Sequence, residues 1–374
     1  MKTDEDRAYL ALNALPGMGP VALSRLVRVA GSAAALLEAP ERHAAGAKGA
    51  LLRGWTRERL RSLAEQEAHR LQRCGAAYFT CKDSRYPEPL RNLHFPPAVL
   101  AYRGSLEALE PQRLRIAVVG ARACTPYGRT QAARFGSGLA AAGVVVVSGA
   151  ARGIDQAGME GALDAEGAVV AVLGSGMDCP YPPENRPLLE RIVAGGGLLL
   201  SEFPCGRPPL RMHFPQRNRV LAGLVRGVLV VQATNKSGSM ITVDWAIRLG
   251  REVFALPGPV DSPVSEGTHQ LLRDGCRLAA APCDILEEYG WARGGQAPPL
   301  PLQLGASAVA QALAQGDASA DDLAAQLHQP VEAVLVELAQ LELNGAAVRL
   351  PGGVYHRCGP AARRAHAPRT GPNG

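Results

Sequence analysis

The chain of 374 residues, with 47% hydrophobic and 20% charged residues, is long enough for two or three globular domains. Its formal net charge of +6 suits an anionic partner. Its eight cysteines form no C-x-x-C pair and no zinc-ligand series, and this pattern predicts reduced thiols in the cytoplasm and no metal site. The acidic start MKTDEDRAYL does not resemble a signal peptide, and no apolar stretch approaches the ~18 residues of a membrane span.

Residues 1–70 are predicted to form a helical domain. Gly17 and Gly19 lie in a turn between two apolar helical stretches. This arrangement resembles a helix-hairpin-helix, whose turn amides can meet a DNA phosphate. We prefer the simpler interpretation of an ordinary helix–helix turn, because short motifs often match by chance. The chain continues with two predicted short strands, at 78–80 and 96–104, around a proline-rich turn.

Residues 71–290 are predicted to form a Rossmann-like α/β domain with a doubly wound, mostly parallel sheet of roughly six strands. Apolar runs without polar interruption are typical of strands that are buried on both faces. Such runs lie at 116–119, 144–147, 169–173, 198–200, 228–231 and 253–256. Helix-like stretches separate them, including 129–142 and 240–249.

The C-terminal part predicts a linker at 291–305, a winged-helix domain at 306–357 and a basic, disordered tail at 358–374. A Ser319-x-x-Asp322 cap opens the first helix of the winged-helix pattern. The expected elements of that pattern are helices at 321–327 and 331–343 and strands at 346–350 and 354–356.

The predicted winged-helix domain has the wrong charge for reading DNA. Residues 306–357 contain six acids against two arginines, and the helix that would enter a groove carries Glu332, Glu337 and Glu342 without any lysine or arginine. Because DNA-reading helices need a positive charge, we expect a protein-contact or structural role for this domain.

Three short loops in the α/β domain each follow an apolar run and combine glycine with one cation. They are 120–122 with Arg122, 148–153 with Arg152, and 235–239 with Lys236. In a parallel sheet such loops gather along the carboxyl edge, where glycine amides, helix N-termini and cations favour an anion. Three of them predict a polyanion site. Asp155, in the first turn of the helix after the second loop, is expected to cap that helix and not to perform chemistry.

The segment 211–219, between the fourth and fifth strands, is predicted to be a basic loop. It holds three arginines, a histidine and Phe214, and no acid. Basic residues around an aromatic ring suit single-stranded nucleic acid, because the cations follow the phosphates and the ring stacks on a base. The alternative is a basic surface loop whose Phe214 packs inward.

The motifs of several enzyme classes are absent. There is no G-x-x-x-x-G-K-[ST] loop, no dinucleotide fingerprint, no G-x-S-x-G elbow and no H-E-x-x-H motif. The histidines are few and scattered, so the sequence favours binding over catalysis, without a cofactor.

From Tyr78 to Tyr289 the chain resembles the DNA-processing protein A (DprA/Smf) family. The matching motifs follow one another in a single order over about two hundred residues, which makes the resemblance specific. They are Val119-Gly120-Ala121-Arg122, Tyr127-Gly128, residues 148–155, Tyr181-Pro182, Ser201-Glu202-Phe203-Pro204, residues 214–219, 237–242 and 250–258, and Gly267-Thr268.

The resemblance implies a cytoplasmic protein that binds incoming single-stranded DNA in natural transformation, protects it and loads the recombinase RecA on it, usually as a homodimer. No catalytic reaction is attached to the family. Carried over by position, the DNA-binding candidates are Gly120, Arg122, Ser148, Gly149, Arg152, Phe214, Arg217, Asn218, Arg219, Lys236, Ser237, Gly238 and Ser239.

Three positions depart from the family pattern. Met159 stands where histidine is common, Gln232 where glutamate is frequent, and His269 where asparagine is frequent. We expect none of them to abolish DNA binding, and Met159 weakens any catalytic proposal for the pocket.

The alternative function is that of a nucleotide-processing enzyme, such as a nucleoside-monophosphate phosphoribohydrolase on a related Rossmann-like fold. Those enzymes use a P-G-G-x-G-T loop and a catalytic glutamate. The corresponding region here is 236–242, and the nearby acid is Asp244.

Overall fold

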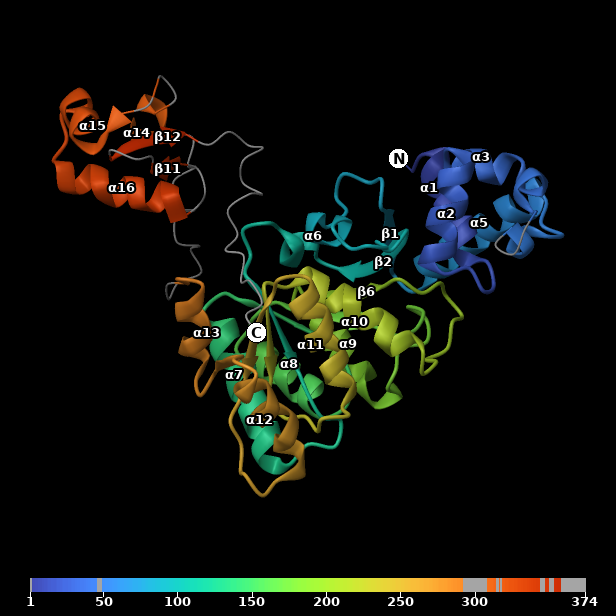
Figure 1. Ribbon diagram of the computed structural model, residues 1–374. Coiled ribbons are helices and arrows are strands. Elements are labelled where there is room, and N and C mark those ends of the chain that lie inside the picture. The colour runs from blue at the N-terminus through green and yellow to red at the C-terminus, as the bar shows by residue number, and fades with distance from the viewer. Residues whose placement is uncertain are drawn as a thin grey trace, which may run out of the picture. The chain divides into compact units, whose positions relative to one another are not determined.

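The computed structural model describes residues 2–45, 49–291, 308–313, 316, 318–343, 347–349 and 353–357 (Figure 1). The chain divides into two compact units, Met1–Ala297 and Pro298–Gly374. The predicted helical domain and α/β domain both lie in the first unit, so their boundary near residue 70 stays a prediction. The predicted linker, apart from Trp291, and the predicted tail lie outside the described residues.

The first unit opens with helices joined by short turns. A capping box between Thr3 and Asp6 starts the first helix, and Gly17, with φ +76°, forms the expected turn before the second. The helices bury leucines against one another and against the first strand of the sheet. They are α1 (Asp4–Ala14), α2 (Pro20–Ala30), α3 (Ala33–Glu38) and α5 (Arg57–Arg73), with 3-10 turns η1 (Pro40–His43) and η2 (Ala50–Leu52).

The sheet of the first unit has nine strands in the order β1-β2-β6-β5-β4-β3-β7-β8-β9. The six predicted parallel strands are confirmed to within one residue at each end. They are β3 (Arg115–Val119), β4 (Val145–Ser148), β5 (Val169–Leu173), β6 (Leu198–Ser201), β7 (Gly227–Val230) and β8 (Glu252–Ala255).

Three further strands make the expected count of roughly six too low. β1 (Ala77–Thr80) and β2 (Val99–Gly104) are the two predicted short strands, and β2 joins the same sheet by pairing antiparallel with β6. β9 (Arg277–Leu278) pairs parallel with β8. Its two residues are both exposed, so no apolar run in the sequence predicts this strand.

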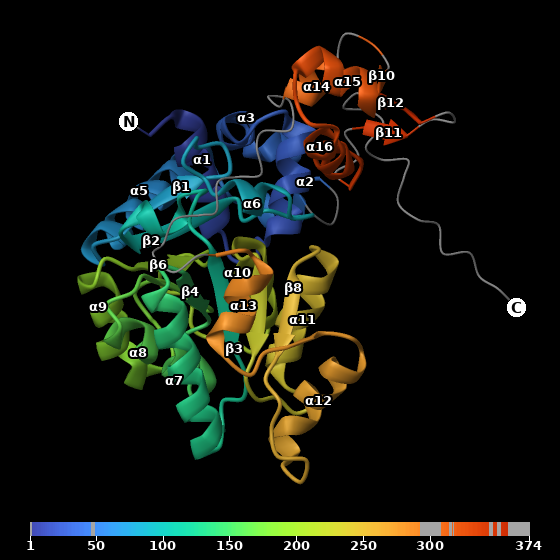
Figure 2. The same cartoon turned by 90° about the vertical axis from the view of Figure 1, so that its left-hand side faces the viewer.

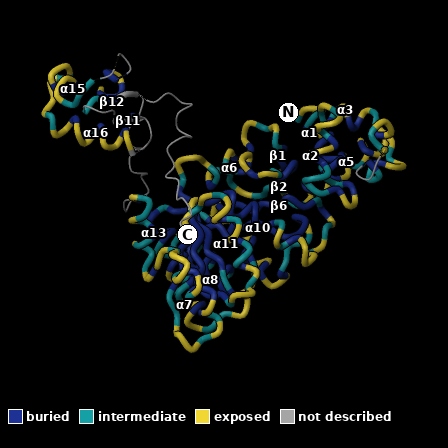
Figure 3. Tube along the Cα trace, viewed as in Figure 1, coloured by how far each residue is buried: buried dark blue, intermediate teal, exposed yellow. Residues whose placement is uncertain are grey.

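Helices cover both faces of the sheet, and most of its strands are buried (Figures 2 and 3). Alternate residues of the strands from β1 to β8 enter two separate cores. Ile116 and Val118 of β3 point into one core, and Ala117 and Val119 into the other. Apolar residues of the first core come from α7 (Pro126–Ala141), α8 (Ile154–Asp164), α9 (Arg186–Ala194) and α13 (Pro282–Glu288). Those of the second come from α6 (Glu88–Arg91), α10 (His213–Leu224), α11 (Gly238–Arg248) and α12 (Glu266–Arg273).

The predicted basic loop at 211–219 is wrong, because the chain is helical from His213 onward as the start of α10. Val220, Leu221 and Leu224 bury the apolar face of this helix against the sheet. The proline at position 215 is tolerated because it lies in the first turn, where an amide has no intrahelical partner.

The strand order reverses around β3, which lies between β4 and β7. In a doubly wound sheet, the carboxyl ends of the two strands at this reversal open a crevice where ligands bind. The loops after β3 and β7 flank this crevice, and the Ala121 amide donates to the Gln232 carbonyl at 2.7 Å.

The second unit has the predicted winged-helix pattern and its own small core, which includes Val309, Leu323, Val334 and Leu338. The Ser319–Asp322 capping box is confirmed, whereas α14 and β10 were not expected. The three strands pair in the order β10-β12-β11. The elements are α14 (Ala308–Ala312), β10 (Ala318–Ser319), α15 (Ala320–Leu327), α16 (Val331–Leu343), β11 (Ala347–Arg349) and β12 (Val354–Arg357).

Candidate nucleic-acid interface

A cavity of about 590 Å³ lies at the carboxyl edge of the sheet, where the strand order reverses. It brings together the loop after β3, the start of α8, one face of α10 and the start of α11. Eight of the thirteen predicted site residues line it, namely Gly120, Arg122, Phe214, Arg217, Asn218, Ser237, Gly238 and Ser239. The other five do not line it: Ser148, Gly149, Arg152, Arg219 and Lys236.

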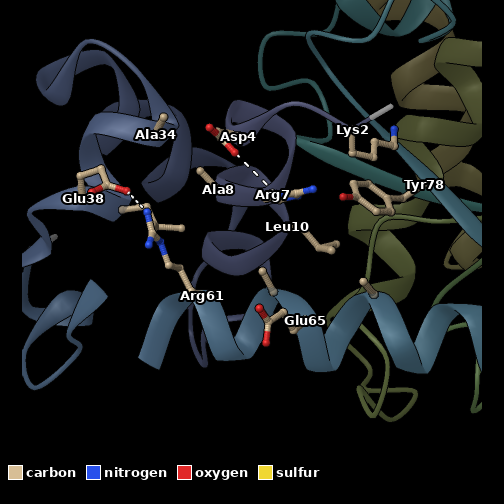
Figure 4. A pocket seen from close by; sticks show the side chains of 13 residues that line it. Lys2, Asp4, Arg7, Ala8, Leu10, Ala34, Glu38, Arg61, Glu65 and Tyr78 are labelled. Atoms are coloured by element: carbon tan, nitrogen blue, oxygen red, sulfur yellow. Dashed lines mark hydrogen bonds and ion pairs between the residues drawn. The ribbon is translucent and has the colours of Figure 1, made fainter. Parts of the chain in front are cut away.

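A second cavity, of about 680 Å³, lies among α1, α3, α5 and β1 (Figure 4). Its charges balance, because three cations and three acids line it, and two of the cations pair with acids of the same lining. Arg61 lies 2.6 Å from Glu38, and Arg7 lies 3.7 Å from Asp4. This cavity therefore does not suit a polyanion, and the edge cavity is the candidate site.

The loop after β3 approaches its neighbours too closely for a side chain at Gly120. A Cβ there would lie 2.7 Å from the Gln232 carbonyl oxygen and 2.7 Å from the Ile154 side chain. Next to this glycine the Arg122 side chain is exposed, and its guanidinium lies 4.8 Å from the centroid of the Phe214 ring. Phe214 is half-buried and lines the cavity, so part of its ring packs inward and part remains open to a ligand.

Asp155 organises the loop after β4 from within. Its carboxylate accepts hydrogen bonds from the amides of Gly149 at 3.1 Å and Ala151 at 3.4 Å, so it binds the loop and does not cap its own helix as expected. Ser148 is buried and donates to the Val118 carbonyl at 2.8 Å. Burial raises the pKa of the Asp155 carboxyl, while nearby Arg217 opposes that shift. Asp155 and Ser148 thus hold this loop in shape beside the cavity.

Arg217 is buried although it lines the cavity. Its guanidinium donates to the carbonyls of Gly149 and Val172 and, at 3.2 Å, to Asn218 Oδ1. Burial lowers the pKa of Arg217 to about 10, so the group remains a cation at neutral pH. Asn218 Nδ2 in turn donates to the Gly238 carbonyl at 3.2 Å, which ties α10 to the start of α11.

Arg219 faces away from the cavity and forms a buried ion pair with Glu202. Successive helix residues are rotated by about 100°, so Arg217, Asn218 and Arg219 cannot all face the same site. The expectation that Arg219 contacts DNA therefore finds no support in its position, which is that of an anchor between α10 and the end of β6.

The loop before α11 presents polar groups at a helix N-terminus. Ser237 is the N-cap, and its hydroxyl lies 2.8 Å from that of Ser239. Lys236 is exposed in the same loop, outside the cavity lining. Amides, hydroxyls and a helix N-terminus of this kind favour a phosphate.

Two residues that sequence reasoning did not select also belong to this surface. Arg211 lines the cavity and is exposed. The Tyr181 ring lies 6.0 Å from that of Phe214, and the Arg152 guanidinium lies 6.0 Å from Tyr181. Arg211 could have been chosen from its place in the basic segment, whereas the position of Tyr181 depends on tertiary contacts alone.

The electrostatics of the cavity are positive. Among the described residues that line it there are three arginines and one carboxylate, Asp155, which is committed to backbone amides. An arginine over an aromatic ring, beside a helix N-terminus, can hold phosphate and stack a base at the same time.

The acid that the enzyme alternative needs is absent from this lining. Asp244 is exposed on α11 and does not line the cavity. The described residues also contain no cluster of three or more metal-ligating side chains. No helix in the described part of the chain could cross a lipid bilayer.

The three departures from the family pattern have structural partners. Met159 is fully buried in the core. Gln232 accepts from the Thr125 amide at 3.0 Å and donates to the Thr125 hydroxyl at 2.8 Å. His269 Nε2 lies 3.0 Å from the Gly258 carbonyl.

Family comparisons match most of the chain. The family described as DNA recombination-mediator protein A matches residues 77–290, and the DprA winged helix domain matches residues 295–353. Protein Smf of Escherichia coli is 40% identical over 278 residues, which cover 72% of this chain and 74% of that protein.

Comparison with solved structures supports the same family. DNA processing protein A from Streptococcus pneumoniae superposes with a TM-score of 0.62 at 32% identity, covering 77% of this chain and 98% of that one. The protein of the same name from Helicobacter pylori, studied for its single-stranded DNA binding mode, has a TM-score of 0.51 at 30% identity and covers 56% and 94%.

Proposed function

Because the chain belongs to the DNA recombination-mediator protein A family, we propose that it binds single-stranded DNA in the cavity at the carboxyl edge of its sheet. The observation that carries the proposal is the Arg122 guanidinium over the Phe214 ring at the mouth of a positive cavity. A phosphate needs such a cation and a base needs such a ring.

In this proposal some residues contact the DNA strand, and others hold the contacting residues in place. Arg122, Arg211 and Lys236 are exposed and reach phosphates, Phe214 stacks on a base, and the loop Ser237–Gly238–Ser239 accepts a further phosphate at the start of α11. Arg217 adds positive charge from behind, while Gly120, Ser148, Gly149, Asn218 and Arg219 keep the loops and α10 in place. Stacking on Phe214 tolerates any base, so binding is independent of sequence.

The biological role follows from the family. In this proposal the protein protects incoming single-stranded DNA during natural transformation and loads RecA on it, as a cytoplasmic homodimer and without catalysing a reaction. The winged-helix domain contributes a protein contact, because Glu332, Glu342, Leu335 and Val336 are exposed along α16 and form an acidic and apolar surface. RecA strand exchange on coated single strands tests the loading, and light scattering tests the dimer.

The binding experiment measures the affinity of a labelled single strand of about 20 nucleotides across a salt series. Replacing Arg122 by Ala together with Phe214 by Leu removes one cation and one ring. We expect affinity to fall about tenfold or more, with a shallower salt slope by about 0.7 for the lost phosphate contact.

Arg134→Ala is the matched control, because Arg134 is an exposed arginine on α7, about 12 Å along the helix from its start at the carboxyl edge. It removes the same charge and should leave the slope unchanged. Unaltered binding by the Arg122/Phe214 variant places the DNA elsewhere, and release of base from nucleoside monophosphates contradicts the absence of catalysis.

A further inference from the structure

At the border of the cavity, the loop after β4 meets the turn between β5 and α9, and three side chains there lie outside the cavity lining. Arg152 comes from the first and Tyr181 and Glu184 from the second. Cations and rings alternate continuously across this surface: Arg122 lies 4.8 Å from Phe214, Phe214 lies 6.0 Å from Tyr181, and Tyr181 lies 6.0 Å from Arg152. The cavity therefore accounts for only one of two adjacent ring–cation pairs.

Asn185 holds the two loops together. Its side chain is buried, and Nδ2 donates to the carbonyls of Ala150 at 3.0 Å and Ala151 at 3.4 Å. The amide bonds directly to the residues that precede Arg152, so Tyr181 and Glu184 are kept beside it. The same loop is fixed from the other side by Asp155, which binds the Gly149 and Ala151 amides. The second ring–cation pair is thus a built feature and not a chance approach of two side chains.

Glu184 occupies the face of Arg152 that a phosphate would use. Its Oε1 accepts from Arg152 Nε at 3.0 Å and also from Nη2. A carboxylate and a phosphate bind the guanidinium fork in the same way. Both side chains are about half exposed, at 52% for Arg152 and 55% for Glu184, so an incoming strand can reach the pair.

We propose that Arg152, Tyr181 and Glu184 form a second nucleotide subsite, in which a strand phosphate displaces Glu184 from Arg152 while the adjoining base stacks on Tyr181. The inference rests on the proposed function, because it assumes that the first nucleotide lies at Phe214. Glu184 acts as an internal competitor that neutralises Arg152 when no strand is bound.

Competition from Glu184 should affect the binding of strands but not of mononucleotides. A free mononucleotide at Phe214 does not extend to Arg152 and meets no competition there. A strand that continues past Phe214 has to displace Glu184, and it gains stacking on Tyr181 in return. Removing the Glu184 charge should therefore strengthen the binding of strands and leave mononucleotides unaffected.

The test compares Glu184→Gln with the unchanged protein, using the full chain and an oligothymidylate of about 20 nucleotides. An exposed ion pair of this kind limits the expected gain in affinity to at most about fivefold. The salt slope should steepen by about 0.7, because Arg152 then neutralises a phosphate without its carboxylate. Thymidine monophosphate should bind both proteins equally.

Asp164→Asn is the matched control. Asp164 lies 2.9 Å from Arg191 in an equally exposed ion pair, at the opposite end of α8 from Arg152 and about 16 Å along that helix. It changes the net charge by the same amount and should alter neither affinity nor slope.

Two further substitutions distinguish competition for Arg152 from electrostatic repulsion of the strand by Glu184, and they test stacking on the Tyr181 ring. With Arg152→Ala in place, Glu184→Gln should lose most of its effect, and an equal gain in both backgrounds overturns the competition. Tyr181→Leu should weaken strand binding by roughly fivefold or more, and Tyr181→Phe should restore it, because stacking needs only the ring.

The outcomes distinguish this inference from the proposed function. Failure of the unchanged protein to bind any single strand contradicts the proposed function itself. Normal binding that responds to the Arg122 and Phe214 substitutions, but not to Glu184→Gln or Tyr181→Leu, overturns the second subsite alone.

Discussion

Two arginines at the same sheet edge have different roles because one is exposed and the other is 4% exposed. Arg122 is free to meet a phosphate. Arg217 bonds two backbone carbonyls and Asn218 and lies close enough to Asp155 to interact with its charge. In the proposed function the first contributes to binding, and the second to the stability of the loops that form the site.

Substitution should separate these roles. Arg217→Ala removes the donor to two buried carbonyls and the nearby cation that favours the charged form of Asp155, so we expect the free energy of unfolding to fall by about 3 kcal/mol. Arg122→Ala, at an exposed position, should change it by less than about 0.5 kcal/mol while weakening DNA binding. Urea unfolding measures both, and equal losses of stability in the two variants contradict the assignment.

His213 gives the stability a pH dependence. Burial lowers the pKa of His213 below its ordinary value of 6.5, and its ring stacks on Phe203 at 4.2 Å between centroids. The unfolded chain then binds more protons than the folded one as the pH falls below 6.5. The stability due to the neutral ring is present above that pH and is lost as the pH falls.

The variant His213→Phe keeps a ring against Phe203 but has no proton to gain. Urea unfolding at about pH 7.5 and about pH 5.5 should show a smaller drop in stability for this variant than for the unchanged protein. An equal drop in both proteins indicates that other groups carry the pH dependence.

At the scale of elements, the helical geometry of α10 determines which of its residues reach the cavity. Phe214, Arg217, Asn218 and Leu221 line it, at the spacing of three, four and seven residues that places side chains on one helix face. Arg219 lies on another face and reaches Glu202. Helical geometry therefore separates the residues of α10 that line the cavity from Arg219, which pairs with Glu202.

The loops after β3 and β4 meet at Gly153. Its backbone has φ +80° and ψ −121°, and a Cβ there would overlap the carbonyl oxygens of Ala121 and Arg122. The Ile154 amide then donates to the Ala121 carbonyl at 3.2 Å. This close approach is what holds Arg122 near the second loop.

Gly153→Ala should therefore cost at least about 2 kcal/mol of stability and also weaken DNA binding. Gly250→Ala is the control, since Gly250 has φ +64° but open space around it. It should cost only about 1 kcal/mol and leave binding unchanged. If both variants behave alike in urea unfolding and in strand binding, the contact between the loops has no special role.

At the scale of the whole molecule, the two compact units have separate cores. The candidate interface lies entirely in the first unit. The exposed residues of α16 in the second unit include Glu332, Glu342, Leu335 and Val336, which do not suit a phosphate backbone.

A chain that ends at Ala297 should consequently bind single strands with an affinity within about twofold of the full chain and with the same salt slope. Circular dichroism establishes that the shortened chain is folded. A loss of affinity beyond that range, or a shallower slope, assigns part of the DNA contact to the C-terminal residues.

Several features of this protein are determined locally and could be predicted from sequence. Each of the six parallel strands contains a continuous apolar run, because strands buried on both faces favour apolar residues. The loops after β3 and β7 carry glycine beside a cation, and their place at the carboxyl edge follows from the parallel topology. The resemblance to DNA-processing protein A rests on the same loops.

Only the tertiary structure decided which basic residues face the cavity and which lie in the core. The three arginines of the segment 211–219 look alike in the sequence. In the structure Arg211 is exposed, whereas Arg217 is buried against backbone carbonyls and Arg219 against Glu202. Arg152 faces Glu184, which is distant in sequence, and Tyr181 lies beside Phe214 because a loop packs next to the start of α10. The physical reason is that burial and charge pairing depend on neighbours brought together by folding, whereas apolar runs and glycine turns are written in consecutive residues.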